Sequence, residues 1–197
     1  MKSLYVDFDE DKIISNLEDV VPLFPLGNMV FFPNTVIPLH IFEERYKQMI
    51  DDSVSSHNLI CMTLMQDDMK DDDLAISKIG CVGRIISNEE GEEGKKNIIL
   101  YGITRIHIDK IIYSKPYRQA KINIIKSKKT SDNDPLYKRI TDLVGEWNLL
   151  LEDYNDNYKI KVDQSSTLSK LTDSLSSIIV SSPSERQYLL EELDEGK

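Results

Sequence analysis

Few side chains in this sequence have the type and spacing that catalysis needs. The three histidines, His40, His57 and His107, fall in different segments. His107 alternates with Ile106 and Ile108, which predicts a solvent-facing position on a strand. We expect His40 to pack at a strand end rather than to act as a base. The H-E-x-x-H, C-x-x-C and G-x-S-x-G patterns are not found. The sequence therefore predicts no catalytic residues and no enzyme activity.

The two cysteines, Cys61 and Cys81, both lie in apolar, strand-like segments. Free cysteine behaves as a small buried hydrophobe, and disulfides are rare in the reducing cytoplasm. A disulfide or a metal site would need partners that the sequence does not supply. We therefore predict two buried, reduced thiols in a cytoplasmic protein.

Two acid-rich segments resemble calcium loops only in part. The segment 67–73 (DDMKDDD) has neither the glycine turn nor the alternate spacing of such a loop. The segment that starts at Asp153 has the first acidic positions, but Tyr158 stands at the glycine position and Gln164 at the final glutamate position. The turn NEEGEEGKK lacks the spacing of a phosphate-binding loop. We predict solvated loops, with no metal and no cofactor.

The overall charge disfavours two classes of partner. Acidic residues outnumber basic ones 34 to 24, for a formal net charge of −10. Nucleic-acid binding depends on cations that neutralise phosphates, and anionic membranes attract basic segments in the same way. The longest basic run is the short segment 126–129, no apolar run approaches the ~20 residues of a membrane span, and the acidic first residues do not resemble a signal or transit peptide. A protein or peptide partner remains.

The first two thirds of the sequence predict a bent or closed sheet. Residues 21–50 indicate strand, turn, strand, turn, strand and helix, with four prolines that restrict these strands to edges, bends or ends. Strand-like segments follow at 58–65, 75–87, 97–113 and 117–125. Gly80 and Gly83 interrupt one of them, which indicates a bulge or a close backbone approach. About six or seven strands joined by short turns favour a bent or closed, antiparallel-rich sheet.

The remainder of the sequence has helical periodicity. After a polar linker, Asp134 and Pro135 form a helix start, and Ser182-Pro183-Ser184-Glu185 is a capping box. Ser165 and Ser166 are candidate caps for a helix between these two. The apolar face of the first helix comprises Leu136, Ile140, Leu143, Val144, Trp147, Leu150 and Leu151. None of the three faces is wide enough for a helix to be stable alone, so they must pack on one another and on the sheet. We predict an α+β protein with a tail (1–18), a β-rich subdomain (19–126) and a helical subdomain packed on it (127–197).

Several blocks resemble the N-terminal, substrate-binding domain of Lon proteases. The most specific is VPLFPLGNMVFFPNTVIPLHIFEERYKQMI, at residues 21–50, in which Asn34 replaces the usual glycine. Weaker blocks are IGCVGRI at 79–85, LYGITRIHI at 100–108 and ERQYLLEELD at 185–194. The resemblance implies a β-barrel-like subdomain (PUA-like) followed by a helical bundle. We expect a stand-alone form without the ATPase and serine–lysine peptidase modules of the full proteases.

The resemblance implies a non-catalytic module that binds unfolded or specific protein segments and serves as an adaptor for these substrates. Such a module needs exposed apolar surface or an unpaired strand edge. The candidates for partner binding are Met29, Phe31 and Met65, although all three could be ordinary core residues. An RNA or small-ligand binder is the alternative, because PUA-like folds also occur in RNA-associated proteins. We expect a monomer or a weak dimer.

Overall fold

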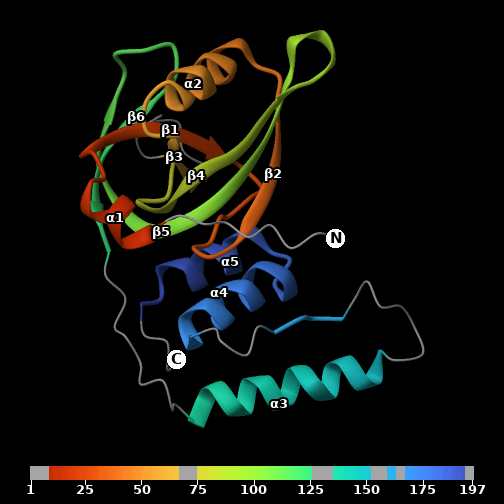
Figure 1. The fold of residues 1–197 in the computed structure, drawn as a ribbon. Helices are drawn as coiled ribbons and strands as arrows, with labels where there is room; N and C mark the ends of the chain where they lie inside the picture. Colours follow the sequence, from red (N-terminus) through yellow and green to blue (C-terminus); the bar gives the residue numbers. More distant parts are fainter. Residues whose placement is uncertain (1–8, 67–74, 126–134, 152–158, 163–166, 194–197) are drawn as a thin grey trace.

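A closed sheet makes up the larger part of the protein (Figure 1). The computed structural model describes residues 9–66, 75–125, 135–151, 159–162 and 167–193. Within these residues six strands form one sheet in the order β2-β5-β4-β3-β1-β6, and β5 also pairs with β6 to close it. The strands are β1 (Val20–Leu26), β2 (Val36–Ile41), β3 (Leu59–Leu64), β4 (Ile79–Glu90), β5 (Lys96–Ile112) and β6 (Gln119–Ile124). The predicted closed sheet and α+β class are confirmed.

The long strand β5 makes closure possible, because its two halves have different neighbours. Its first half pairs with β2 on one side and β4 on the other, and its second half pairs with β6. The register between β4 and β5 shifts between Val82 and Gly83 and again between Ile85 and Ser87. Such bulges bend a strand and increase its twist. The predicted irregularity of β4 is therefore confirmed.

The segment between β1 and β2 differs from the prediction. Residues 29–32 form no strand, although their side chains still alternate. Phe31 packs in the core cluster with Phe24 and Tyr46, whereas Val30 and Phe32 pack in a separate cluster with Leu64 and Leu190. Backbone proximity explains this path, because a β-carbon on Gly102 of β5 would lie 2.1 Å from the carbonyl oxygen of Phe32. Asn34 then turns the chain with the left-handed φ of 59° that asparagine tolerates.

The two cysteines are buried and free, as predicted. Cys61 packs in one apolar cluster with Val21 and Ile106, and Cys81 packs in another with Phe24 and Met49. Burial raises the pKa of both thiols well above the usual range, because it disfavours the charged thiolate. Both side chains therefore behave as core hydrophobes.

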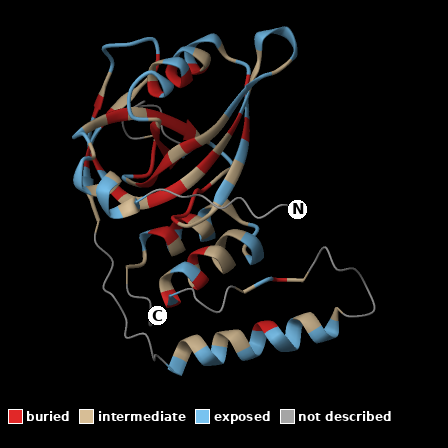
Figure 2. Ribbon diagram, in the orientation of Figure 1, coloured by how far each residue is buried: buried red, intermediate tan, exposed pale blue. Residues whose placement is uncertain are grey.

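Five α-helices lie within the described residues. They are α1 (Glu10–Ser15), α2 (Glu44–Val54), α3 (Pro135–Leu150), α4 (Leu168–Ile179) and α5 (Pro183–Glu191), and a 3-10 turn, η1 (Glu92–Gly94), joins β4 to β5. Helix α2 covers one end of the barrel and buries Tyr46, Met49 and Ile50 (Figure 2). Helices α4 and α5 lie at the opposite end (Figure 1). None of the helices described here is long and apolar enough to cross a membrane.

One arginine of β5, Arg105, forms hydrogen bonds with both α4 and α5. The guanidinium of Arg105 donates to both carboxylate oxygens of Asp173 in α4, at 2.5 and 3.2 Å, and to the carbonyl oxygen of Leu190 in α5 at 3.0 Å. Gln187 of α5 also donates to the carbonyl oxygen of Ile79 at 3.0 Å. Asp173 is 2% exposed, so this is a buried, bidentate ion pair that fixes the helices on the sheet.

One of the predicted helix caps, Ser182, lies within the described residues. Ser182 caps α5 as predicted, since its hydroxyl accepts from the backbone N–H of Glu185 at 3.4 Å. Thr167 caps α4, whereas the predicted caps Ser165 and Ser166 lie outside the described residues. Asp134, the linker 126–134, the acidic run 67–73 and the calcium-loop-like residues 153–157 also lie outside them.

Candidate functional site

The three histidines do not form a site. Each is exposed and lies beside a different partner: the Nδ1 atom of His40 is 2.6 Å from the amide oxygen of Asn97, that of His57 is 3.4 Å from Glu18, and that of His107 is 3.0 Å from Asp109. No three metal-ligating side chains cluster within the part of the chain that the structure describes. The exposed position predicted for His107 is confirmed.

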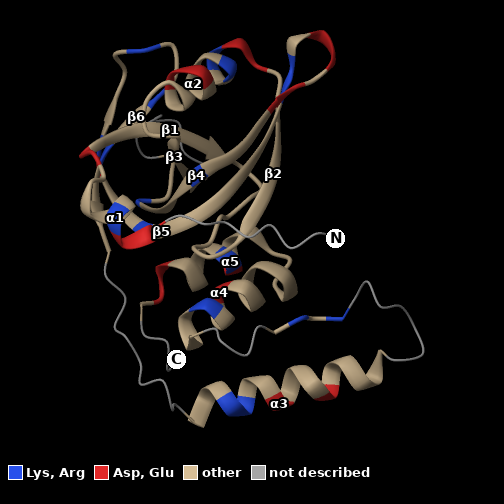
Figure 3. Cartoon of the chain, viewed as in Figure 1, with Lys and Arg blue, Asp and Glu red and all other residues tan. Residues whose placement is uncertain are grey.

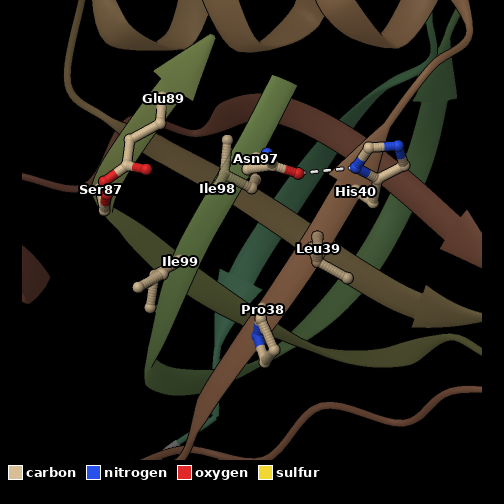
Figure 4. A pocket seen from close by; sticks show the side chains of 8 residues that line it. All are labelled: Pro38, Leu39, His40, Ser87, Glu89, Asn97, Ile98 and Ile99. Atoms are coloured by element: carbon tan, nitrogen blue, oxygen red, sulfur yellow. Dashed lines mark hydrogen bonds between the residues drawn. The ribbon is translucent and has the colours of Figure 1, made fainter. Parts of the chain in front are cut away.

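One surface hollow, of about 320 Å³, lies over β2, β4 and the start of β5 (Figure 4). Figure 4 shows the side chains of His40 and Asn97 directed towards one another across the two strands, where the hydrogen bond joins them. The remaining walls are mostly apolar and include Pro38, Ile98 and Ile99. The hydrogen bond between His40 and Asn97 therefore links β2 to β5 at this hollow.

A more distinctive groove of about 310 Å³ lies between the end of β1, strand β2 and the start of α2. We call it the α2 groove. Its lining residues are Phe24, Pro25, Leu26, Gly27, Leu39, His40, Ile41, Phe42, Glu43, Arg45, Tyr46 and Met65. Eight of these side chains are aromatic, aliphatic or thioether groups, and two carry opposite charges. Such a surface can bind an apolar side chain and fix the direction of the chain that bears it.

Aromatic packing shapes the α2 groove. The rings of Phe24 and Tyr46 meet edge to face, with 4.5 Å between centroids, and the guanidinium of Arg45 lies 4.6 Å from the centroid of the Tyr46 ring. Arg45 also pairs with Glu43 at 2.7 Å. Burial raises the pKa of Tyr46, and the nearby Arg45 only partly offsets this effect. The hydroxyl is therefore neutral at physiological pH, and the charges at the rim are balanced.

Phe42 is the exposed aromatic residue of this groove. The helical period in the sequence begins at Ile41 and predicts Phe42 on the apolar face of the helix. Helix α2 starts only at Glu44, so Phe42 lies in the connection from β2. Its ring is 62% exposed, whereas Tyr46, four residues later, is buried. The only sequence signal for this role is an aromatic residue directly before the charged helix start at residues 43–45.

The three predicted partner-binding residues have different positions. Met65 lines the α2 groove, where its backbone N–H donates to the carbonyl oxygen of Leu26 at 2.9 Å. Met29 is half-buried and packs against the core cluster that contains Phe24 and Tyr46. Phe31 is 3% exposed, which contradicts the surface exposure expected of it. Alternation along residues 29–32 turns its ring into the barrel, so its role is to fill the core.

The edge of β2 offers little to an incoming strand. Within the described residues β2 pairs with β5 alone. Thr35 accepts from the N–H of Gly102, so alternate residues from Thr35 onward bond to β5, and Val36, Pro38 and His40 direct their backbone groups outward. Proline has no N–H, which leaves a gap at the centre of this edge. Side-chain capture in the α2 groove is therefore better supported than strand addition.

A family model for the substrate-binding domain of the ATP-dependent protease La (LON) matches residues 20–196. Among curated relatives, the chain is 31% identical to a Lon protease of Flavobacterium johnsoniae over 145 residues, which are 70% of this chain and 17% of that protein. It is 24% identical to a Lon protease of Dictyoglomus thermophilum, over 91% of this chain and 23% of that protein. The chain thus spans less than a quarter of the length of these two proteins.

Solved structures show the same fold. A Lon N-terminal domain protein from Xanthomonas campestris superposes with a TM-score of 0.68 at 20% identity, covering 89% of this chain and 92% of that one. The N-terminal domain of a Mycobacterium avium complex Lon protease gives a TM-score of 0.64 at 15% identity, covering 90% and 92%. Together with the family match over most of the chain, these likenesses establish that the chain belongs to the LON substrate-binding domain family.

Proposed function

We propose that this chain is a polypeptide-recognition module that binds exposed apolar segments of other proteins in the α2 groove. The observation that carries the proposal is the position of Phe42, an aromatic ring 62% exposed at the mouth of a groove whose interior is aromatic and aliphatic. Membership of a substrate-binding family supports the same class of ligand. An adaptor role that delivers substrates follows from this proposal, and the cytoplasmic location stays a prediction.

The α2 groove is better suited to apolar segments of unfolded polypeptides than to a single ligand of defined shape. Met65 is flexible and polarisable, so it can adapt to different apolar side chains. Phe42 adds contact area at low cost in conformational entropy. Met29 is half-buried and packs against the core cluster of Phe24 and Tyr46, two residues that line the groove. Binding in this way depends on area and shape more than on sequence, which gives broad selection of apolar segments.

We also propose that the module contributes binding and no chemistry. The sequence has no Walker motif and no serine–lysine peptidase motif. Purified protein is therefore expected to hydrolyse neither ATP nor a casein substrate. Hydrolysis that co-purifies with the protein and persists in repeated preparations would contradict this proposal.

A labelled, permanently unfolded polypeptide titrated with the protein tests the binding function. We expect saturable fluorescence anisotropy that persists from low to moderate salt, because apolar contacts are not screened. The alternative, RNA binding, would show a steep salt dependence with a labelled RNA of similar length. No binding of the polypeptide at either salt concentration would overturn the proposal.

Phe42→Ala locates the site, with Tyr188→Ala as the matched control. Tyr188 in α5 is 67% exposed and lies outside the α2 groove. Loss of an exposed aromatic anchor is expected to cost about 1–2 kcal/mol, or about 5- to 30-fold in affinity, whereas the control keeps the affinity of the unmodified protein. Equal effects of the two substitutions, at unchanged melting temperature, would move the site away from the groove.

A further inference from the structure

Helix α3 exposes an apolar strip that the described residues of the chain do not cover. Leu143, Trp147 and Leu150 are 55%, 51% and 76% exposed. The neighbouring face of the helix is occupied: Val144 is buried, and the side chain of Asn148 binds both the N–H and the carbonyl oxygen of Ile160 at 2.8 Å. The prediction that the whole apolar face turns inward is therefore wrong for this strip.

The spacing of the strip is that of a helix–helix seam. Five apolar residues follow one another at alternating steps of four and three. They are Leu136, Ile140, Leu143, Trp147 and Leu150. This repeat keeps one line of side chains facing a partner helix, as in a coiled coil. The exposed strip is consequently suited to a second helix rather than to an extended segment.

The distribution of charged residues along α3 favours antiparallel packing against α3 of a second copy. Lys138 and Arg139 lie near the start of the helix, Asp142 lies at its middle and Glu146 lies in its second half (Figure 3). Antiparallel packing of two copies brings Lys138 and Arg139 of each copy towards Glu146 of the other, whereas parallel packing in register brings like charges together. The helix is also charge-balanced in a chain of net charge −10, so two copies repel least here.

We propose that two copies of this chain associate through α3, packed antiparallel about a two-fold axis, with Arg139 of each copy opposite Glu146 of the other. In a heptad seam these two positions flank the same apolar layers. The register also places Trp147 beside Lys138 and Arg139 of the second copy. These two residues line a shallow hollow of about 380 Å³ with Asp142, Leu143 and Glu146, and an indole ring packs well against such cations.

The interface is small, so the dimer is weak. A helix of 16 residues is about 24 Å long, and a single helix pair buries less than the ~1,600 Å² of a standard interface. We expect dissociation in the range of about 10–100 µM. Sedimentation velocity over a concentration series should show a monomer–dimer equilibrium. Trp147 is the single tryptophan, so its emission should shift to shorter wavelength as dimers form.

Charge reversal tests both the surface and the direction. Arg139→Glu and Glu146→Arg should each weaken self-association at least tenfold, because like charges then meet at both symmetry-related positions. An equimolar mixture of the two variants should recover the dimer, since every pair is again of opposite sign. Failure of the mixture to recover, with both variants folded by circular dichroism, would overturn the antiparallel register.

Leu143→Glu and Leu149→Glu form a matched pair of variants. Leu149 is 67% exposed but lies about 120° around the helix from the strip. Leu143→Glu should abolish the dimer, and Leu149→Glu should leave it intact. A monomer up to millimolar concentration, or a dimer indifferent to Leu143→Glu, would overturn the proposal. If Leu143→Glu instead abolished polypeptide binding by a protein that never dimerised, the strip would belong to substrate.

Discussion

At the end of the barrel that α2 covers, two aromatic residues close together in sequence differ in burial. Tyr46 and Phe42 belong to the same aromatic group in sequence, yet one ring is 9% exposed and the other 62%. The helical period was expected to begin at Ile41, but α2 starts three residues later, at Glu44, and this difference accounts for the exposure of Phe42. The helical periodicity at residues 41–50 predicted α2 correctly. It could not distinguish the buried Tyr46 from the exposed Phe42, because the start of α2 depends on where β2 ends.

Asp52 fixes α2 to the turn before β6 and gives the stability of the protein a pH dependence. Its Oδ2 atom accepts from Lys115 at 2.7 Å and from Tyr117 at 2.6 Å. These two hydrogen bonds hold the pKa of Asp52 below its usual value of 3.8, with that from Lys115 the larger cause. A carboxyl with a lowered pKa stabilises the fold above its unfolded pKa, and this contribution is lost as pH falls through the folded pKa.

We therefore expect Asp52→Asn to lower the free energy of unfolding at pH 7 by up to about 1 kcal/mol, since the group is partly exposed. The difference from the unmodified protein should shrink below pH 4. Urea unfolding at several pH values between 7 and 3 measures this difference in the free energy of unfolding. Glu90→Gln, on the β4–β5 hairpin, is the control. A destabilisation that grows towards pH 3 would show that the sign of the pKa shift is wrong.

Gly102 is required by close backbone packing. A β-carbon there would lie 2.1 Å from the carbonyl oxygen of Phe32, which cannot move without displacing the segment 29–33. Gly102→Ala should cost at least about 1–3 kcal/mol, the typical cost of overpacking a core. Gly145→Ala is the opposite case, because nothing lies within 4 Å of its β-carbon and alanine favours a helix by about 1 kcal/mol. Thermal unfolding should move in opposite directions for the two variants.

At the scale of elements, the sequence predicted the strands whose residues form a continuous apolar or alternating pattern. The nearly continuous apolar run at 58–65 contains the fully buried β3, Leu59–Leu64, and the long strand expected at 97–113 is β5, Lys96–Ile112. The parallel pairing of β1 with β3 has no local signal, because it depends on contacts between residues far apart in sequence. The strand expected at residues 29–32 was wrong for the same reason. The side chains do alternate, but Phe31 packs in one hydrophobic cluster and Val30 and Phe32 pack in another, without strand pairing.

Packing of the helices on the sheet was predicted, but the ion pair between Arg105 and Asp173 was not. Arg105 and Asp173 are 68 residues apart, and neither has a pattern that marks it. Removing one partner of a buried ion pair is typically worth 3–5 kcal/mol, because the other charge stays buried. We expect Asp173→Asn to cost about 3 kcal/mol and to increase hydrogen exchange in α4 and α5 more than in β3. Uniform exchange throughout the chain would indicate that the helices and the barrel unfold together.

At the scale of the whole molecule, the two proposed surfaces lie at opposite ends. Helix α2 covers the far end of the barrel from α4 and α5, and α3 lies beyond these helices (Figure 1). A dimer through α3 would carry two α2 grooves directed away from each other. Two sites on one assembly can bind a long chain more tightly than either site alone, provided that the chain can span them.

This separation predicts independent variants. Phe42→Ala should weaken polypeptide binding without changing self-association, and Leu143→Glu should do the reverse for a short polypeptide that reaches only one groove. For a long polypeptide, Leu143→Glu should reduce the apparent affinity at protein concentrations where the dimer forms. Anisotropy titrations with a short and a long labelled chain measure both effects. Loss of short-chain binding in Leu143→Glu would show that the surfaces are coupled.

The closure of the barrel also has a consequence for synthesis on the ribosome. Val20 of β1 pairs with Lys121 of β6, so the sheet cannot close until about one hundred further residues have been made, and such non-local pairing is slow. At ordinary rates of translation that interval is roughly 5 to 20 s. During this interval the apolar segment VVPLFPL of β1 is not yet paired with β6. A protein proposed to bind exposed apolar segments thus presents one of its own while it is being made.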